Sequence, residues 1–351
     1  MHLNVFASQS CFVHCKGCYS YSREERPGKI FPTDKLVSFL QYAHDVGVPK
    51  ITLCGGDPLA RDDIIDLLEE IKEIGFRVSL DTVGSPIIKN ASIGRRKVVN
   101  QLDAKRIAEL VDVIGIPIDG STDEIFRRFR NTKSDIVNEQ LAICQELHKY
   151  GANICINTVA HKGNLEDAHE LAKLIRGLDY INKWQIFQYM PLGKYGVKNR
   201  KLFEITDEEF SNFQSDVLEV FDNDITKLQF KSSSDRMNTY MLIDNSGNAW
   251  IPSSDNRSPS NENGNRIIGN ISNPNEWYKI CSLLDREIPV SHQLQNNYTS
   301  GVEARQRFVN AISNNGEYRN LPQLQQTTIG PQSAESIIKD NLGKEESERW
   351  Y

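Results

Sequence analysis

The chain has 351 residues, of which 39% are hydrophobic and 25% charged, and its formal net charge is −6. This length allows one large α/β domain, alone or with a smaller appendage. The negative charge excludes a global positive field that would attract nucleic acid or an anionic membrane. The first residues lack the features of a signal peptide, and no run approaches the ~18 apolar residues of a membrane span. We therefore expect a cytoplasmic protein, in a compartment where stable disulfides are rare.

Strand and helix patterns alternate from residue 3 to residue 190. Apolar residues recur at helical spacing in the helix segments, and Thr33 is a candidate cap for the first of them. Tandem strand–helix units predict a parallel sheet with helices outside it, which right-handed crossovers curl into a partial (β/α)6 barrel of the TIM type. The predicted strands are residues 3–8, 50–54, 77–83, 112–118, 153–159 and 184–190, and the predicted helices are residues 33–47, 62–75, 103–110, 134–150 and 165–175.

This alternation ends near residue 195. Residues 202–221 predict one more helix, capped at Thr206 with Glu209 three residues later. Residues 238–252 predict a β-hairpin, and the Pro-, Ser- and Asn-rich residues 252–266 predict a loop. We therefore predict three regions: a barrel at residues 1–195, a C-terminal extension at residues 196–290 and an irregular polar tail at residues 291–351.

Cys11, Cys15 and Cys18 directly follow the first predicted strand. A loop at that position lies at the C-terminal end of the sheet, where barrel enzymes carry their chemistry. The cysteine count of seven is odd and the other four are scattered, which favours metal or catalytic chemistry over disulfides. A structural zinc ion needs a fourth ligand, for which only His14 lies nearby. A [4Fe–4S] cluster held by three cysteines would leave one iron without a protein ligand. From the spacing alone, both the cluster and zinc stay open.

Gly55, Gly56 and Asp57 come directly after the second predicted strand, and Pro58 follows them. Glycines expose the backbone to a polar ligand, and Asp57 adds a carboxylate. A Gly-Gly-Asp-Pro sequence is by itself equally well explained by a turn. Its place one strand–helix unit after the cysteines favours a ligand site.

Together, the motif CFVHCKGC and the turn GGDP resemble the radical S-adenosylmethionine (radical SAM) superfamily, whose hallmarks are CxxxCxxC and a GGEP-like turn. The segments DTVGS, PIDGSTDEIFRRFRN, INTV and FQYMP are also similar to that family, and the resemblance covers residues 3–195. It implies an oxygen-sensitive enzyme with a [4Fe–4S] cluster. The cluster would reductively cleave S-adenosylmethionine (SAM), and the resulting 5′-deoxyadenosyl radical would abstract a hydrogen atom from the substrate.

The resemblance also implies roles for individual residues. The residue before the third cysteine is often an aromatic that packs on adenine, but here it is Gly17, and Tyr19 is the candidate to replace it. The implied cluster ligands are Cys11, Cys15 and Cys18, and the implied SAM-binding residues are Gly55, Gly56, Asp57, Thr82 and Met190.

The substrate is less clear from the sequence. Four segments, including INTVAHKGNLED and SDRMNTYMLID, are similar to the group that contains viperin and the molybdopterin-pathway cyclase, which implies a small nucleotide-like substrate. Lys231 and Arg236 would then face an anionic substrate, although surface solvation explains them equally well, and Cys155 replaces a basic residue common in that group.

Two alternatives stay open. One is single-cluster modification of a ribosomal peptide or natural-product precursor, since only Cys281 lies beyond residue 155 and auxiliary clusters need more cysteines. The other is a zinc-binding structural or interaction protein. An enzyme of the radical SAM type would also need a reductase, such as flavodoxin or ferredoxin.

Four more polar residues stand at predicted strand ends. Cys54 precedes the Gly-Gly turn and is a candidate hydrogen-atom donor, although a small buried strand residue is the more ordinary role. Asp119, Asn157 and Gln188 end later strands, so ligand or substrate contact and a purely structural role are both open for them.

Overall fold

The computed structural model describes residues 1–20, 30–95, 97–132, 135–236, 239–252 and 265–286. The chain divides into two units, Met1–Pro289 and Val290–Tyr351, and every described residue belongs to the first. The tail predicted at residues 291–351 and most of the loop predicted at residues 252–266 lie outside the described residues.

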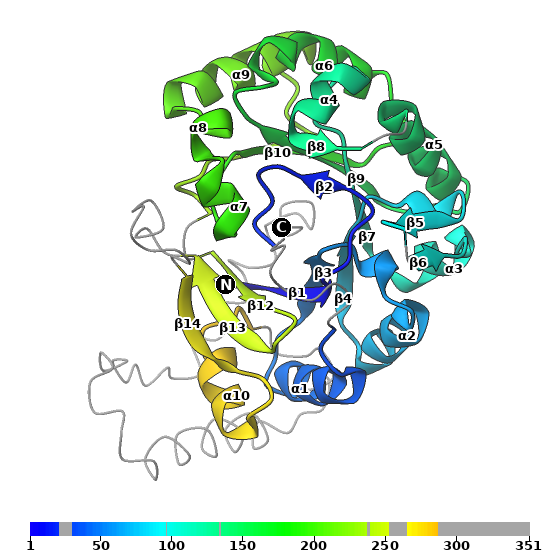
Figure 1. Ribbon diagram of the computed structural model, residues 1–351, viewed down its shortest axis with the longest axis vertical. Helices are drawn as coiled ribbons and strands as arrows, with labels where there is room; N and C mark the ends of the chain where they lie inside the picture. Colours follow the sequence, from blue (N-terminus) through cyan, green and yellow to red (C-terminus); the bar gives the residue numbers. More distant parts are fainter. Residues whose placement is uncertain (21–29, 96, 133–134, 237–238, 253–264, 287–351) are drawn as a thin grey trace, which may run out of the picture. The chain divides into compact units, whose positions relative to one another are not determined.

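One ten-stranded sheet organises the first unit. The strands that were predicted from the sequence are present, and the sheet curves around a centre without closing (Figure 1), which confirms the predicted partial barrel. Neighbouring strands are parallel from β11 to β12, and β13 and β14 are antiparallel. In sheet order the strands are β11 (Leu228–Lys231), β10 (Lys183–Gln188), β9 (Ile154–Ala160), β7 (Val113–Pro117), β4 (Arg77–Asp81), β3 (Lys50–Gly55), β1 (His2–Ser8), β12 (Tyr240–Ile243), β13 (Asn248–Pro252) and β14 (Asn265–Asn270).

Helices cover the outer side of this curved sheet (Figure 1). Their apolar faces pack against outward-facing strand residues such as Leu3, Val5 and Leu53, which are almost fully buried. Burying each such side chain contributes about 1.5–3 kcal/mol. No helix among the described ranges is long and apolar enough to cross a membrane. The predicted helices are α1 (Thr33–Asp45), α2 (Ile64–Ile74), α3 (Ala104–Leu110), α5 (Ile136–His148), α6 (Ala168–Arg176) and α9 (Asp207–Val220).

Local sequence explains one helix start but not another. α9 begins with the predicted capping box, in which the Glu209 N–H donates to the Thr206 hydroxyl and the Thr206 N–H donates to the Glu209 carboxylate. The predicted cap at Thr33 is wrong, because Pro32 occupies the N-cap position of α1. The Thr33 hydroxyl instead accepts a hydrogen bond from Arg61 at 2.5 Å.

Residues after 195 extend the same sheet at both ends. β12 and β13 form the predicted hairpin, with Gly247 at φ 82° in the turn, and β12 pairs in parallel with β1. β11 was not predicted and pairs in parallel with β10. The predicted boundaries at residues 195 and 290 stay predictions. The short elements that sequence periodicity missed are β2 (His14–Cys15), η1 (Pro58–Ala60), η2 (Ser85–Ile87), β5 (Ala91–Ile93), β6 (Lys97–Val99), α4 (Asp123–Phe129), β8 (Arg130–Asn131), η3 (Leu165–Asp167), α7 (Gly193–Lys198), α8 (Arg200–Phe203), β11, β14 and α10 (Pro274–Cys281).

Arg61 is a buried charge that joins three segments beneath the strand ends. The residue is 2% exposed, and its side chain donates to the carbonyl oxygens of Ala7 at 3.1 Å and Phe31 at 3.3 Å. Its guanidinium also pairs with Asp63 at 2.6 Å. These bonds fasten the end of β1 and the start of α1 to the turn that follows β3.

Replacing Arg61 with Ala should lower the free energy of unfolding by about 3–5 kcal/mol, because Asp63 and two carbonyl groups lose a buried partner. Urea unfolding followed by circular dichroism measures this. The matched control is Arg128→Ala, which removes an exposed ion pair with Glu124 and should cost about 0–1 kcal/mol. Equal losses in the two variants would contradict the role given to Arg61.

Candidate functional site

The three predicted cysteines lie on one short loop that follows β1, at the end of the sheet where the parallel strands finish. Figure 1 shows this loop and β2 inside the ring of strands. All three thiols are free and partly buried. β2 pairs with β8, and the Lys16 N–H donates to the Phe129 carbonyl at 2.8 Å, so a later segment of the chain holds the middle of the loop in place.

The Gly-Gly turn after β3 fastens the start of the cysteine loop. The Gly56 N–H donates to the Ser8 carbonyl at 2.7 Å, and the Asp57 N–H donates to the Ser10 carbonyl at 2.7 Å. A Cβ atom at Gly56 would lie 2.3 Å from the Ser10 oxygen, and Gly55 has a φ of 110°. Both positions therefore require glycine, because only a residue without a side chain allows the two backbones to approach this closely.

Asp57 is fully buried and connects the ends of β3 and β4. Its carboxylate accepts hydrogen bonds from the Leu59 N–H at 3.0 Å, the Thr82 hydroxyl at 2.7 Å and the Val83 N–H at 2.7 Å. Burial raises the pKa of Asp57 to about 6, and these three donors oppose that shift. The roles of Asp57 and Thr82 at SAM stay predictions, while the geometry shows them holding two turns together.

Arg130 is a buried cation beside the second cysteine. Its Nη1 lies 3.6 Å from the Cys15 Sγ, and its Nε forms an ion pair with Asp119, whose side chain is fully buried. Burial lowers the pKa of Arg130, but the charge and hydrogen bond of Asp119 together with the neighbouring cysteines outweigh burial and hold the pKa above its ordinary value. Asp119 also accepts a hydrogen bond from the Val159 N–H at 2.8 Å. Asp119 is therefore the charge partner of Arg130, a residue that sequence analysis did not single out, although it lies in the segment PIDGSTDEIFRRFRN.

The thiols of Cys11 and Cys15 lie in a setting that favours their neutral form when no metal is bound. Burial raises the pKa of Cys15 to about 12, although Arg130 opposes this shift. Burial also raises the pKa of Cys11 well above its ordinary value. Metal ligation would replace those protons, because the thiolate is the ligand form.

Gly17 is explained by the aromatic residues around it. A Cβ atom there would lie 2.5 Å from a ring carbon of Phe129 and 2.8 Å from a ring carbon of Tyr189. The Phe129 ring stacks on His161 at 4.9 Å and packs edge-on against Phe203 at 5.0 Å, so it has no room to move. Aromatic side chains from two other segments thus fill the space at this position.

Tyr19 lies among the strand ends. Its side chain contacts Phe6 with ring centroids 5.8 Å apart and hydrogen-bonds to Cys54. The residue is 41% exposed, yet burial raises the pKa of its hydroxyl well above the ordinary value. Its predicted contact with adenine stays a prediction, as does the hydrogen-donor role of Cys54.

The segment after β10 packs on the cysteine loop. The Tyr189 hydroxyl donates to the Gly196 carbonyl at 2.9 Å, and the Asn199 amide donates to the Lys16 carbonyl at 2.5 Å. A Cβ atom at Gly193 would lie 2.2 Å from the backbone carbonyl oxygen of Tyr19, so the two backbones approach closely here. This segment contains Met190, whose predicted contact with SAM stays a prediction.

A polar pair crosses the inner face of the sheet. The Asn157 amide on β9 donates to Asp81 on β4 at 2.9 Å, across β7. Gly115 on β7 permits this contact, because a Cβ atom there would lie 2.1 Å from the Asp81 Oδ1. Burial raises the pKa of Asp81 to about 6, and Lys231 opposes that shift. Asp81 was not singled out from the sequence, because its partner Asn157 lies far away along the chain and only the fold brings the two together.

Both polar ends of the Gln188 side chain form hydrogen bonds within the protein. Its amide donates to Asp207 at 3.0 Å, and its side-chain oxygen accepts from the Ser233 N–H at 2.7 Å. These bonds connect the end of β10 to the start of α9 and to the turn after β11. A substrate role for Gln188, and those for Asp119 and Asn157, stay predictions.

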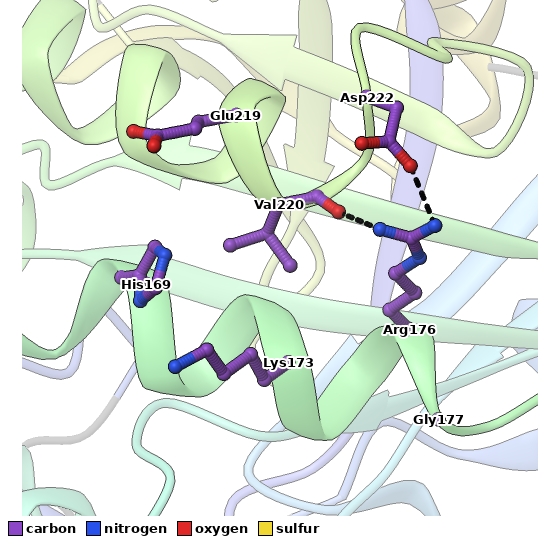
Figure 2. Close-up of a pocket in the computed structure, with 7 residues that line it drawn as sticks. All are labelled: His169, Lys173, Arg176, Gly177, Glu219, Val220 and Asp222. Carbon is purple, nitrogen blue, oxygen red and sulfur yellow. Dashed lines mark hydrogen bonds and ion pairs between the residues drawn. The ribbon is translucent and has the colours of Figure 1, made fainter.

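A pocket on the outer wall lies between α6 and α9 (Figure 2). Both of its long basic side chains are paired: Arg176 pairs with Asp222 at 2.6 Å, and Lys173 pairs with Glu170 at 2.8 Å. The helices that form this pocket lie on the outer side of the sheet, whereas the cysteine loop lies inside the ring (Figure 1). We assign no chemistry to this pocket.

The family model described as the Radical SAM superfamily matches residues 5–175. These residues form a radical SAM domain. An S-adenosylmethionine-dependent nucleotide dehydratase of Lacinutrix mariniflava is 24% identical over 253 residues, which cover 70% of this chain and 49% of that protein. A protein of the same name from Flammeovirga pacifica is 24% identical over 278 residues, covering 75% of this chain and 83% of that protein. The chain thus spans about half the length of the first relative and most of the second.

The solved structure "Native anSMEcpe with bound AdoMet and Kp18Cys peptide" has the same fold. Its TM-score is 0.55 at 16% identity, and the match covers 81% of this chain and 82% of that one. The radical SAM family implies a [4Fe–4S] cluster and SAM as cofactors, as predicted from the cysteine and GGDP motifs.

The residues present fit these cofactors. Among the described side chains, no group of three or more His, Cys, Asp and Glu is close enough to hold a single metal ion. Ligands of a four-iron cluster stand farther apart, because each cysteine binds a different iron. Ser20 lies 3.2 Å from the Cys18 Sγ and donates to the Gly55 carbonyl at 2.6 Å, and Arg130 lies beside Cys15. Hydrogen bonds to the sulfur ligands help to set the potential of such clusters, and Arg130 is placed to donate one to Cys15.

Replacing Gly17 with Ala should lower the free energy of unfolding by about 1–3 kcal/mol and reduce iron incorporation, because the new methyl group overlaps Phe129. Thermal unfolding and iron analysis after reconstitution measure the two effects. The double variant Gly17→Ala/Phe129→Leu removes the overlap and should recover part of both losses. No recovery would show that Phe129 is not what excludes a side chain at position 17.

Proposed function

We propose that the chain is a radical SAM enzyme that acts on a small, nucleotide-like substrate. The observation that carries this proposal is the cysteine loop, whose three thiols are held at the strand ends by the Gly-Gly turn and by β8. Cys11, Cys15 and Cys18 would hold the cluster, which would supply the electron for reductive cleavage of SAM and so give access to radical chemistry on the substrate.

The chain's own residues would bind and orient the cofactors. Cys11, Cys15 and Cys18 would ligate three irons and leave the fourth for SAM. The Arg130 guanidinium is suited to pair with the carboxylate of SAM, because it is a buried cation beside Cys15. The segment after β10 would exclude water from the loop that it packs on.

The names of two relatives, both nucleotide dehydratases, support a nucleotide-like substrate. Peptide modification is the second candidate, supported by a structural neighbour whose title includes a bound peptide. A reductase such as flavodoxin or ferredoxin would deliver the electron, and we place the reaction in the cytoplasm.

The test is anaerobic reconstitution with iron and sulfide, reduction with dithionite, addition of SAM, and measurement of 5′-deoxyadenosine by mass spectrometry. The parent protein should form 5′-deoxyadenosine. Cys11→Ala, Cys15→Ala and Cys18→Ala should each abolish it, since each removes one of three cluster ligands. Cys144→Ala is the matched control, because that thiol is buried on α5 away from the loop, and it should keep the cleavage.

Three outcomes would contradict the proposal. The first is stoichiometric zinc without iron or sulfide in the purified protein. The second is cleavage retained in all three loop variants. The third outcome concerns the substrate. If a peptide library increases the yield of 5′-deoxyadenosine and ribonucleotides do not, the substrate is a peptide rather than a nucleotide.

A further inference from the structure

The cysteine loop and the segment that packs on it carry basic residues without acidic ones. Residues 9–20 and 189–203 contain no aspartate or glutamate, although the net charge of the whole chain is −6. α7 and α8 belong to the second segment and lie beside the loop (Figure 1), where the Asn199 amide donates to the Lys16 carbonyl at 2.5 Å. The two segments therefore form one local region of positive charge. Its basic residues are Lys16, Lys194, Lys198, Arg200 and Lys201.

Exposed lysines of this region stand without a charge partner. Lys16 lies on the loop, and Lys198 and Lys201 lie on α7 and α8. Lys162 joins them from the turn after β9, because its N–H donates to the Phe203 carbonyl at the end of α8 at 3.1 Å. Within the described ranges, none of these lysines forms an ion pair. Together, Lys16, Lys162, Lys198 and Lys201 form a basic surface beside the cysteine loop.

Several exposed basic residues elsewhere are compensated within the chain. On α5, for example, Lys149 pairs with Glu146 at 2.6 Å. At the edge of the basic surface itself, Arg200 pairs with Glu204 at 2.5 Å. The lysines of the basic surface keep their full charge, so they create a positive potential that the rest of the chain does not cancel locally. An acidic protein that docks on this surface would supply the missing negative charge.

The basic surface lies where an electron would have to enter the site. Lys16 stands between Cys15 and Cys18, so its backbone is part of the loop that would hold the cluster. Electron tunnelling slows steeply with distance, and an electron donor therefore has to approach this loop closely. The chain as a whole is acidic and would repel an acidic donor. The basic surface would then select the one approach that brings the donor to the cysteine loop.

We propose that the basic surface docks an acidic one-electron carrier of the ferredoxin kind. This proposal rests on the proposed function, because a carrier has a task here only if the cysteine loop holds a cluster. The reduced carrier loses one electron and the cluster gains it, and no bond forms or breaks. Docking that is steered by charge in this way associates fast and weakens as salt is added.

The experiment measures, by biolayer interferometry, how an acidic [2Fe–2S] ferredoxin in its oxidised form binds the reconstituted full chain. The parent protein should bind it, and added potassium chloride should weaken the binding. The double variant Lys198→Glu/Lys201→Glu should raise the Kd by about ten-fold or more. The matched control, Lys35→Glu/Lys105→Glu, changes the net charge equally at exposed positions of α1 and α3, in the outer layer (Figure 1). It should leave the Kd within about two-fold.

A second measurement separates docking from the chemistry. With dithionite as the reductant, both double variants should form 5′-deoxyadenosine as fast as the parent protein. With reduced ferredoxin as the reductant, Lys198→Glu/Lys201→Glu should be about ten-fold slower and the control unchanged. Iron content and thermal unfolding check that each variant is folded. Where the double variant fails that check, Lys198→Gln and Lys201→Gln are tested singly, and each should raise the Kd by about two-fold or more.

Two results would overturn the docking surface. One is equal ferredoxin affinity in the parent protein and the folded lysine variants at low salt. The other is equally tight binding of ovalbumin, an acidic protein without a redox centre, which would show general attraction of acidic proteins. A parent protein that forms no 5′-deoxyadenosine with dithionite, yet binds ferredoxin through these lysines, would refute the proposed function and leave the docking surface standing.

Discussion

The rest of the site depends on two backbone hydrogen bonds between the Gly-Gly turn and the chain that enters the cysteine loop. They run from Gly56 to Ser8 and from Asp57 to Ser10, and their length is set by the absence of a side chain at Gly56. Glycine in this turn is therefore a steric requirement of the fold itself. Any ligand role of the turn comes in addition to that requirement. The same contact fixes where the cysteines stand relative to the end of β3.

Buried polar groups connect the Gly-Gly turn to the neighbouring strands and so fix their relative positions. Asp57 connects the turn to β4 through Thr82 and Val83. Arg61, four residues later, fastens the same turn to the end of β1 and the start of α1. Each group is costly to bury alone and is stable only with its partners in place. The geometry at the strand ends is therefore cooperative, since the loss of one partner leaves the other groups unsatisfied.

Periodicity and short motifs predicted the main strands, the helices between them and the position of the cysteine loop. These features are local, because each depends on residues close together in the sequence. The elements that were missed depend on distant partners. β2 and β8 are two residues each and form only by pairing with each other, and β11 is defined by β10. For the same reason, the sequence did not predict a place in the site for Arg130 or Asp81. Arg130 contacts Asp119 and Cys15, and Asp81 contacts Asn157, and only the fold brings these partners together.

Gly17 shows how the fold alters what a family pattern implies. Taken by itself, a glycine where relatives often have an aromatic residue suggests a missing contact. In the structure, Phe129 and Tyr189 occupy the space beside Gly17 from other segments, so aromatic side chains still pack at this point of the loop. The charges behave similarly. The net charge of −6 excludes a global positive field, yet Arg130, Lys231 and Arg236 are buried as cations at the strand ends. The local charge at the strand ends is therefore set by a few desolvated side chains rather than by overall composition.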